Sequence, residues 1–241
     1  MQDIAAMRID FHTHILPKID DGSDSVETSL QLIRALQEQG IGVIALTPHY
    51  SAWQDPPEKF LRKRSESMEI LREKLPHDHP TLLCGAEIYY YEGLDSMVGL
   101  ERLCLEGTNC LLVEMPYGHW SDRAVSDINT LNAGSGFRVM LAHVERYLKM
   151  GNAKAVKWLS DQGLMIQCNA EFFLNRFSRH KAMSMLRKGE IQAIGSDCHD
   201  LTNRVPNCGE AYDLIRDKGG DDAEAYLLRQ GAMILNSLTN E

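Results

Sequence analysis

The chain has 241 residues, of which 44% are hydrophobic and 24% are charged, and its formal net charge is −9. This length is enough for a large buried core, whereas the negative charge argues against nucleic acid or an anionic membrane surface as a partner. Residues 1–7 lack a signal-peptide pattern and no long uncharged apolar run follows, so we expect one cytoplasmic domain over residues 1–241, not inserted in a membrane, with an N-terminal extension at 1–6.

Apolar segments of strand length alternate with segments of helical periodicity along the whole chain. In chain order, the expected strands are 8–14, 43–46, 81–84, 110–113, 138–142, 164–168 and 191–195, and the expected helices are 26–39, 58–75, 122–133, 153–162, 181–188, 210–217 and 223–238. Strands separated by helices predict a parallel sheet with both faces covered, which is an α/β fold. Seven such units favour a (β/α)7 barrel over an open sheet, although periodicity does not decide whether a barrel closes.

The first expected helix carries signals at both of its ends. Asp24 is followed three residues later by Glu27, a spacing that resembles a capping box. Gly40 directly follows the last residue of the periodic segment and suits a C-terminal stop. These residues therefore bound the helix that connects the first two strands.

Side chains that bind metals follow one expected strand after another. His12 and His14 are two residues apart at the end of the first strand, so their imidazoles point to the same side. Later strand ends add His49, Glu87, Glu114, His143, Asp197 and His199. A single histidine or glutamate in such a place is usually an ordinary polar residue. In a parallel barrel, however, all these ends lie on one face, where active sites form, and together they predict one shared site.

This gathering of carboxylates needs positive charge, because carboxylates held close together repel one another and lose solvation. Bound cations remove that cost. The ligand set has nitrogen and oxygen but no thiolate, which suits Mn, Zn or Fe better than Ca or an iron–sulfur cluster. The six cysteines include no Cys-x-x-Cys pair, and four lie in apolar runs typical of buried thiols in a reducing compartment. We therefore predict a multinuclear metal centre.

Short motifs in the chain resemble those of a known superfamily. They are Asp10–His14, Asp20–Ser23, Thr47–His49, Gly85–Tyr90, Val113–Glu114, Ala142–Tyr147 and Ser196–His199. The chain resembles the PHP (polymerase and histidinol phosphatase) superfamily from about residue 7 to its C-terminus. Within it, the Asp-Asp-Gly-Ser, Ala-Glu-Ile-Tyr-Tyr and His-x-Glu-Arg-Tyr stretches are similar to those of bacterial protein-tyrosine phosphatases from capsular and exopolysaccharide operons.

This resemblance implies a distorted (β/α)7 barrel with its active site at the C-terminal ends of the strands and three metal ions, commonly manganese. It assigns the first ion to His12, His14, Glu87 and Asp197, the second to Glu87, Glu114 and His143, and the third to Asp21, His49 and His199. It also implies two functional arginines, Arg146 and Arg204. The loop 201–206 differs from the Asn-x-x-Arg-Pro-Pro sequence expected around the second of them.

The implied reaction is hydrolysis of phosphotyrosine on the tail of a bacterial tyrosine kinase, which would regulate capsular or exopolysaccharide synthesis. Metal ions would clamp the phosphate and activate a water molecule, the arginines would bind phosphate oxygens, and His49 or His199 could protonate the leaving oxygen if not fully committed to metal. Other functions stay open: a small-molecule phosphatase such as histidinol-phosphate phosphatase, a polymerase-associated nuclease, or a non-catalytic metal-binding regulatory subunit. The resident metal and a homo-oligomeric state are also left open.

Two further features have competing interpretations. Aromatic residues follow several strand ends, where they either flank a phosphotyrosine ring or are ordinary half-buried loop residues: Tyr50, Trp53, Tyr117, Trp120 and Phe172. Cys198 and Arg204 have the Cys-x5-Arg spacing of cysteine-dependent phosphatases, but no glycine lies between them and Asp197 precedes the cysteine. We therefore expect metal chemistry. Four other histidines, His77, His79, His119 and His180, are expected at the surface.

Overall fold

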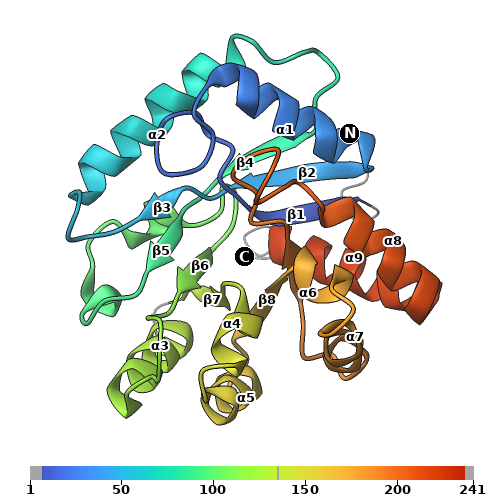
Figure 1. Cartoon of the computed structure of the whole chain (residues 1–241). Coiled ribbons are helices and arrows are strands. Elements are labelled where there is room, and N and C mark those ends of the chain that lie inside the picture. The colour runs from blue at the N-terminus through green and yellow to red at the C-terminus, as the bar shows by residue number, and fades with distance from the viewer. Residues whose placement is uncertain (1–6, 135, 237–241) are drawn as a thin grey trace.

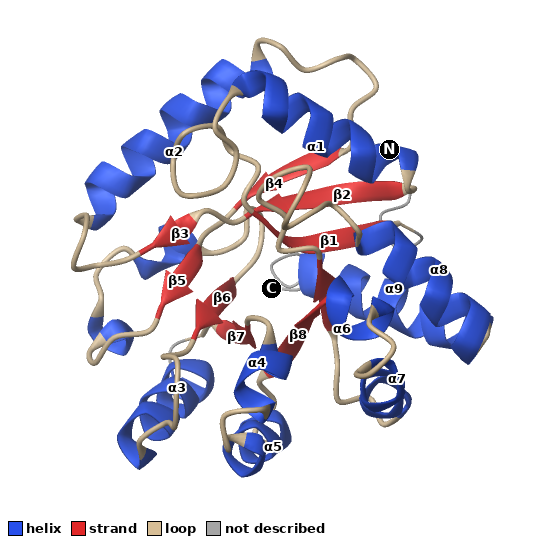
Figure 2. Ribbon diagram, viewed as in Figure 1, coloured by secondary structure: helices blue, strands red, loops and turns tan. Residues whose placement is uncertain are grey.

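A computed structural model of the chain describes residues 7–134 and 136–236. The predicted extension at 1–6 and the end of the last predicted helix, 237–238, lie outside these ranges. In the described part, a curled parallel sheet is surrounded by helices, as Figure 1 and Figure 2 show. The predicted α/β barrel architecture is confirmed. Across these same ranges, no helix combines the length and the apolar character that a membrane crossing requires.

The strands run in parallel and pair in two sets, β1-β2-β4 and β3-β5-β6-β7-β8-β9. They are β1 Arg8–Thr13, β2 Ile41–Leu46, β3 His49–Tyr50, β4 Thr81–Cys84, β5 Glu87–Tyr89, β6 Cys110–Glu114, β7 Arg138–Leu141, β8 Met165–Asn169 and β9 Ala193–Gly195. The second and third predicted strands thus each continue after a break, as β3 and β5. Pro48 lies in the first break and has no N–H to donate to a neighbouring strand. The two breaks lie side by side and let the sheet bend towards the site.

The curled sheet returns to its first strand. The N–H of His14 donates to the carbonyl of Cys198 at 2.9 Å, and the N–H of Asp197 donates to the carbonyl of His12 at 2.8 Å. Gly195 permits this close approach, because a Cβ there would lie 2.6 Å from the Cβ of His12. Residues more than 180 positions apart in the sequence therefore share one edge of the barrel.

A bulge in β1 directs the two histidines of the first motif. Asp10 pairs with Ile44 and Thr13 with Leu46, so one extra residue of β1 lies between these two pairs. A bulge of this kind changes which side chains face inward. As a result Phe11 belongs to the apolar interior of the barrel, whereas His12 and His14 both point into the ligand cluster.

Most helices lie around the outside of the sheet, whereas the C-terminal part of α9 (Asp221–Leu235) packs against the barrel interior, with Ile234 in the same cluster as Ile9 (Figure 1). The helices are α1 Val26–Glu38, α2 Pro57–Arg72, α3 Asp122–Gly134, α4 Val144–Leu148, α5 Ala153–Asp161, α6 Ala170–Leu174, α7 Arg179–Arg187, α8 Cys208–Gly219 and α9 Asp221–Leu235, with 3-10 turns at Leu94–Ser96 and Leu100–Leu103. The sequence did not predict α4 and α6, because five residues are too few to show helical periodicity. α6 follows β8 directly and α4 begins three residues after the end of β7, and both form part of the rim of the site.

The predicted capping box of α1 is wrong. Ser25 is the N-cap, and its Oγ accepts a hydrogen bond from the N–H of Thr28 at 3.1 Å. Asp24 instead accepts a hydrogen bond from the Thr28 hydroxyl at 2.8 Å, so it supports the cap without forming it. The predicted stop at Gly40 is confirmed, since this glycine has a φ of 81° directly after the helix.

Two apolar clusters support the site. The larger cluster joins the outer face of the sheet to the helices, with Ile33, Ile44 and Leu159 among its buried residues. The smaller cluster fills the barrel interior and includes Ile9 and Met140. Because close-packed interiors deform little, these clusters hold the carboxyl ends of the strands in fixed positions.

Candidate metal centre

His12, His14 and Glu87 form the innermost part of the site, and all three are buried. The Nε2 atoms of His12 and His14 lie 3.1 Å apart. Oε2 of Glu87 lies 3.2 Å from the first of these nitrogens and 3.3 Å from the second. The expectation that both imidazoles face one point is therefore confirmed.

Glu87 lies at the junction of the ligand groups. Its Oε1 is 2.8 Å from Nε2 of His143 and its Oε2 is 2.9 Å from Nδ1 of His49. Nevertheless, Oε2 is buried and has no hydrogen-bond partner, although three ring nitrogens approach it. Glu114 completes this side, with Oε1 at 3.4 Å from Nε2 of His143. Donor atoms that converge on a buried oxygen without hydrogen-bond geometry are arranged as ligands around a cation would be.

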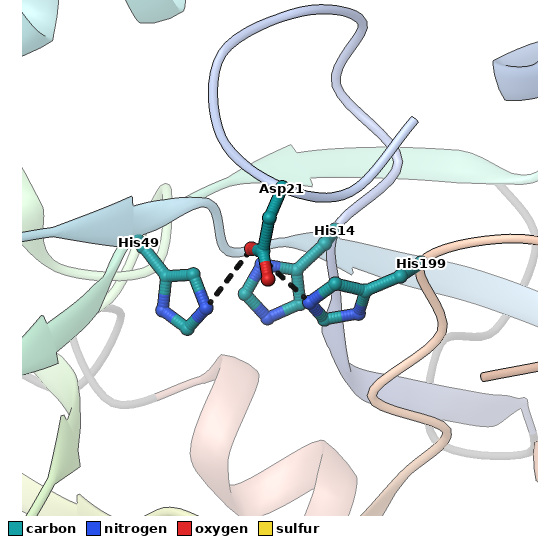
Figure 3. A group of neighbouring side chains, drawn as sticks. All are labelled: His14, Asp21, His49 and His199. Atoms are coloured by element: carbon teal, nitrogen blue, oxygen red, sulfur yellow. Dashed lines mark ion pairs between the residues drawn. The ribbon is translucent and has the colours of Figure 1, made fainter. Parts of the chain in front are cut away.

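The outer part of the site contains His14, Asp21, His49 and His199, which come from separate segments of the chain (Figure 3). One ligand atom from each lies within 4.8 Å of all the others. Oδ1 of Asp21 is 3.4 Å from Nε2 of His49 and 3.5 Å from Nε2 of His199. The Asp21 side chain is 66% exposed, so this group opens towards solvent.

The structure thus brings every predicted metal ligand into one cluster, which contains three overlapping groups of suitable donor atoms among the described residues. Asp197 joins it through Oδ1, which lies 3.5 Å from Nε2 of His12. In these groups His14 lies with the outer residues and His49 also lies beside Glu87 and Glu114. The division of the ligands among individual ions therefore stays a prediction.

The electrostatics of the cluster fit bound cations. Burial and repulsion by Glu87 raise the pKa of Glu114 to about 7. Burial alone would raise the pKa of Glu87 as well, but the surrounding histidines, His12 first, hold it well below its usual range. Burial, the positive charge of His14 and that of Arg204 lower the pKa of His199 to about 4. An ion between these groups would relieve the carboxylate repulsion and use the neutral imidazole as a ligand.

Two of the predicted ligands have strained backbones. His143 has a φ of 36° and Asp197 has a φ of 55°, in the left-handed region that non-glycine residues seldom adopt. Each lies two residues beyond the end of a strand, β7 for His143 and β9 for Asp197. Strain of this kind persists where the surrounding structure imposes it, and it concentrates at functional sites.

Asp20 is a functional residue that the sequence analysis did not select. Its Oδ2 lies 2.8 Å from Nδ1 of His14 and accepts a hydrogen bond from the N–H of His49 at 3.0 Å. Its Oδ1 accepts from the N–H of Gly22. Asp20 thereby orients His14 with Nε2 turned inward, the role that carboxylates often play behind a metal-binding histidine. The signal was its place in the Asp-Asp-Gly-Ser motif, next to the predicted ligand Asp21.

We expect Asp20→Asn to weaken metal binding about 10- to 100-fold, because the amide removes the charge that orients His14. Calorimetric titration of the metal-free protein with Mn²⁺ measures this effect. Asp24→Asn is the matched control, since Asp24 lies in the same loop but contacts Thr28 and no predicted ligand. Equal affinities of the wild type and Asp20→Asn would contradict the assigned role.

A chain of amides on β8 was also missed. Oε1 of Gln167 accepts a hydrogen bond from the N–H of His143 at 2.6 Å. Nε2 of Gln167 donates to Asn169, and Nδ2 of Asn169 donates to Oδ2 of Asp197 at 2.9 Å. These two amides orient ligands on both neighbouring strands. Their spacing of two residues within an otherwise apolar strand was the signal in the sequence.

Both predicted arginines lie at the edge of the cluster and contact Asp197. Nη2 of Arg146 donates to Oδ2 at 2.5 Å, and Nη2 of Arg204 donates to Oδ1. Arg204 also places Nη1 2.7 Å from Nε2 of His199. The side chains are 33% and 36% exposed, so both guanidinium groups remain accessible to a ligand. The altered loop sequence therefore still brings Arg204 to the site.

Cys198 is unsuited to be a nucleophile. It is fully buried, and burial raises the pKa of its thiol well above the usual value. All six cysteines are free thiols. We expect Cys198→Ala to retain most of the turnover per bound metal, because the thiol takes no part in metal-assisted hydrolysis. A steady-state assay with metal analysis checks this, and a thousandfold loss with the metals still bound would favour a cysteine mechanism.

The aromatic residues divide into two groups. Tyr50, Trp120 and Phe172 are at most 5% exposed and belong to the core, so they do not flank a ligand with an open face. Trp53 and Tyr117 are 60% and 78% exposed. The predicted surface positions of His77, His79, His119 and His180 are confirmed.

The fold and the site together define a barrel protein with a candidate multinuclear metal centre at the carboxyl ends of its strands. Residues 8–236 match the family described as capsular polysaccharide synthesis, CpsB/CapC, and the chain belongs to this family. The family assignment agrees with the resemblance inferred from the motifs.

Named relatives and a solved structure are similar over nearly the whole chain. The tyrosine-protein phosphatase CpsB of Streptococcus agalactiae serotype III (strain NEM316) is 30% identical, covering 95% of this chain and 98% of that protein. The tyrosine-protein phosphatase CpsB of Streptococcus pneumoniae is 31% identical, covering 88% of this chain and 91% of that protein. A structure described among those of YwqE from Bacillus subtilis and CpsB from S. pneumoniae, metal-dependent tyrosine phosphatases, matches with a TM-score of 0.81 at 24% identity, covering 95% and 94% of the two chains. This last match supports the fold.

Proposed function

We propose that the chain is a metal-dependent protein-tyrosine phosphatase. The observation that carries this proposal is the position of Arg146 and Arg204, whose guanidinium groups both reach Asp197 beside the ligand cluster. Both guanidinium groups are about one-third exposed beside the cluster, where they can bind an anion. A phosphate monoester carries two negative charges and offers oxygens that a guanidinium binds in pairs. The tyrosine-protein phosphatases among the relatives agree with this interpretation.

Three ions, with manganese as the proposed metal and iron or zinc as alternatives, fit the nitrogen and oxygen donors of the cluster. The proposed ligands are His12, His14, Asp21, His49, Glu87, Glu114, His143, Asp197 and His199. Bound at these residues, the ions would offset the negative charge of the phosphate and would make a water molecule more acidic.

The chain's own residues would bind the phosphate and supply a proton. Arg146 and Arg204 would bind phosphate oxygens and offset the charge that develops during transfer. Of the two histidines proposed to protonate the leaving oxygen, His49 lines the adjoining pocket and its side chain is 36% exposed, whereas that of His199 is 4% exposed. His49 is therefore the better placed to reach the leaving group, a role that requires one of its ring nitrogens to be free of metal.

The proposed substrate is the phosphotyrosine tail of a bacterial tyrosine kinase in the cytoplasm, and its hydrolysis would regulate capsular or exopolysaccharide synthesis. The decisive experiment compares turnover of a phosphotyrosine peptide from such a tail with turnover of histidinol phosphate, with and without EDTA. Metal analysis is made on the same sample. Peptide turnover that EDTA abolishes is the expected result. Preference for histidinol phosphate would identify a small-molecule phosphatase, and turnover of neither substrate by metal-loaded protein would favour a regulatory subunit.

A further inference from the structure

A pocket of about 460 Å³ opens beside the candidate metal centre. Three predicted ligands, Asp21, His49 and Glu114, line both this pocket and the centre. Trp53 and Tyr89 also line the pocket. If the phosphate of a ligand lies at the metal centre, the group that is esterified to this phosphate therefore lies next to the pocket.

Tyr89 and Trp53 are positioned by the strands that carry the ligands. Tyr89 lies two residues after Glu87 on β5, so both side chains point to the same side of the strand. In the adjoining strand, Tyr89 pairs with Glu114. Trp53 follows His49 by four residues, in the loop after β3, which pairs with β5 (Figure 1). The strand pairing thus places both aromatic residues next to the ligands His49, Glu87 and Glu114.

The contact between these rings leaves a binding surface open. Their centroids lie 4.7 Å apart with an interplanar angle of 85°, an edge-to-face arrangement. Trp53 remains 60% exposed in spite of this contact. An edge-to-face pair can accept a third ring, because aromatic groups favour edge-to-face and offset contacts.

The charged groups of the pocket favour an uncharged ring. Lys63 is the one lysine or arginine among the described lining residues, and its Nζ lies 2.5 Å from Oδ2 of Asp55, which Lys59 also contacts, at 2.6 Å. Asp20 is committed to His14. The remaining carboxylates, Asp21 and Glu114, are proposed metal ligands. Among the described lining residues, four carboxylates therefore outnumber one ammonium group, which disfavours a second phosphate or an acidic side chain in this pocket.

A second pocket, of about 360 Å³, adjoins the other side of the site and includes Arg146, Asp197 and Arg204. Its one aromatic lining residue in the described ranges is Phe172, which is 5% exposed and packed in the core. A substrate ring would meet polar groups there. The pocket beside Trp53 is therefore the better place for it.

We propose that Trp53 and Tyr89 form a specificity-determining subsite that binds the aromatic ring of an aryl phosphate monoester while its phosphate lies at the metal centre. This inference rests on the proposed function and adds the reason for a preference for phosphotyrosine over alkyl phosphates. The ring packs against the indole, and its oxygen points to His49 and the ions.

The test measures binding of two phosphonates, phenylphosphonate and methylphosphonate, to the Mn²⁺-loaded protein by calorimetry. Both carry the same phosphonate group and neither is hydrolysed, so the difference in affinity reports on the ring alone. The wild type is expected to bind phenylphosphonate about tenfold more tightly than methylphosphonate. This difference is the size expected for one aromatic contact together with the apolar area that it buries. Trp53→Ala is expected to lose most of this preference and to keep its affinity for methylphosphonate. Trp53→Phe retains part of the preference.

Tyr117→Ala is the matched control, because Tyr117 is also an exposed aromatic residue beyond a strand end but does not line the pocket. It should preserve both affinities. A wild type without preference, or a Trp53→Ala variant that keeps it or loses both affinities equally, would overturn the subsite. The proposed function is judged separately by peptide turnover: a ring preference without turnover refutes the phosphatase, whereas turnover without a ring preference refutes only the subsite.

Discussion

Removal of the metal ions is expected to abolish phosphotyrosine hydrolysis, and His14→Ala is expected to lower kcat by about three orders of magnitude or more even with Mn²⁺ present. His14 is fully buried and its Nε2 lies within 3.5 Å of Nε2 of His12, Oε2 of Glu87 and Oδ1 of Asp197. Its loss would remove a donor and leave the carboxylates with less compensating charge. Added Mn²⁺ is expected to restore hydrolysis by the wild-type protein after chelation.

The measurement combines turnover, metal content and melting temperature on one preparation. His180→Ala is the matched control, because this histidine is exposed and lies outside the ligand cluster. It should retain activity and metal. Full activity of a metal-free sample, or normal turnover by His14→Ala, would contradict the metal mechanism. Loss of the fold in His14→Ala would be recognised by its melting temperature, and Asp197→Asn, which keeps the volume of the side chain, then replaces it.

Arg146→Ala is expected to lower kcat/KM by about 2–4 kcal/mol of transition-state stabilisation, the size of a lost charge-stabilising donor. The metals hold part of the phosphate, and the guanidinium of Arg146 can offer two parallel hydrogen bonds to the rest. Arg146→Lys should recover only part of the activity, since an ammonium group cannot form this pair. Steady-state kinetics on the phosphotyrosine peptide measures both variants.

The competing interpretation is that Arg146 serves only to hold Asp197, to which it donates at 2.5 Å. In that case the alanine variant would lose metal or thermal stability and show normal turnover in the metal-loaded fraction. Arg34→Ala is the control, because Arg34 forms an exposed ion pair with Glu38 on α1 and lies outside the ligand cluster. Normal turnover per metal-loaded enzyme would remove Arg146 from the catalytic residues.

Local sequence was sufficient to predict the parallel α/β architecture and the ligands that follow strand ends, whereas the distorted barrel was implied by the motif resemblance. Strands that alternate with helices leave a periodic pattern, and a parallel barrel places all its strand ends on one face. His12, Glu87 and Asp197 could therefore be selected without knowledge of their contacts. In the structure, Nε2 of His12 lies 3.2 Å from Oε2 of Glu87 and 3.5 Å from Oδ1 of Asp197. The motif resemblance added Asp21, which follows no strand.

The orientation of these side chains was decided by the tertiary structure alone. The bulge in β1, the neighbouring breaks after β2 and β4, and the left-handed backbone of Asp197 all depend on pairing between distant segments. The tertiary structure also decided that the Trp53 ring is exposed and the Trp120 ring is buried in the core. Asp10 and Ser196, which share a hydrogen bond at 2.6 Å across 186 positions, illustrate the reason: periodicity reports which face of an element is apolar, whereas the partner across the barrel is chosen by packing of the whole chain.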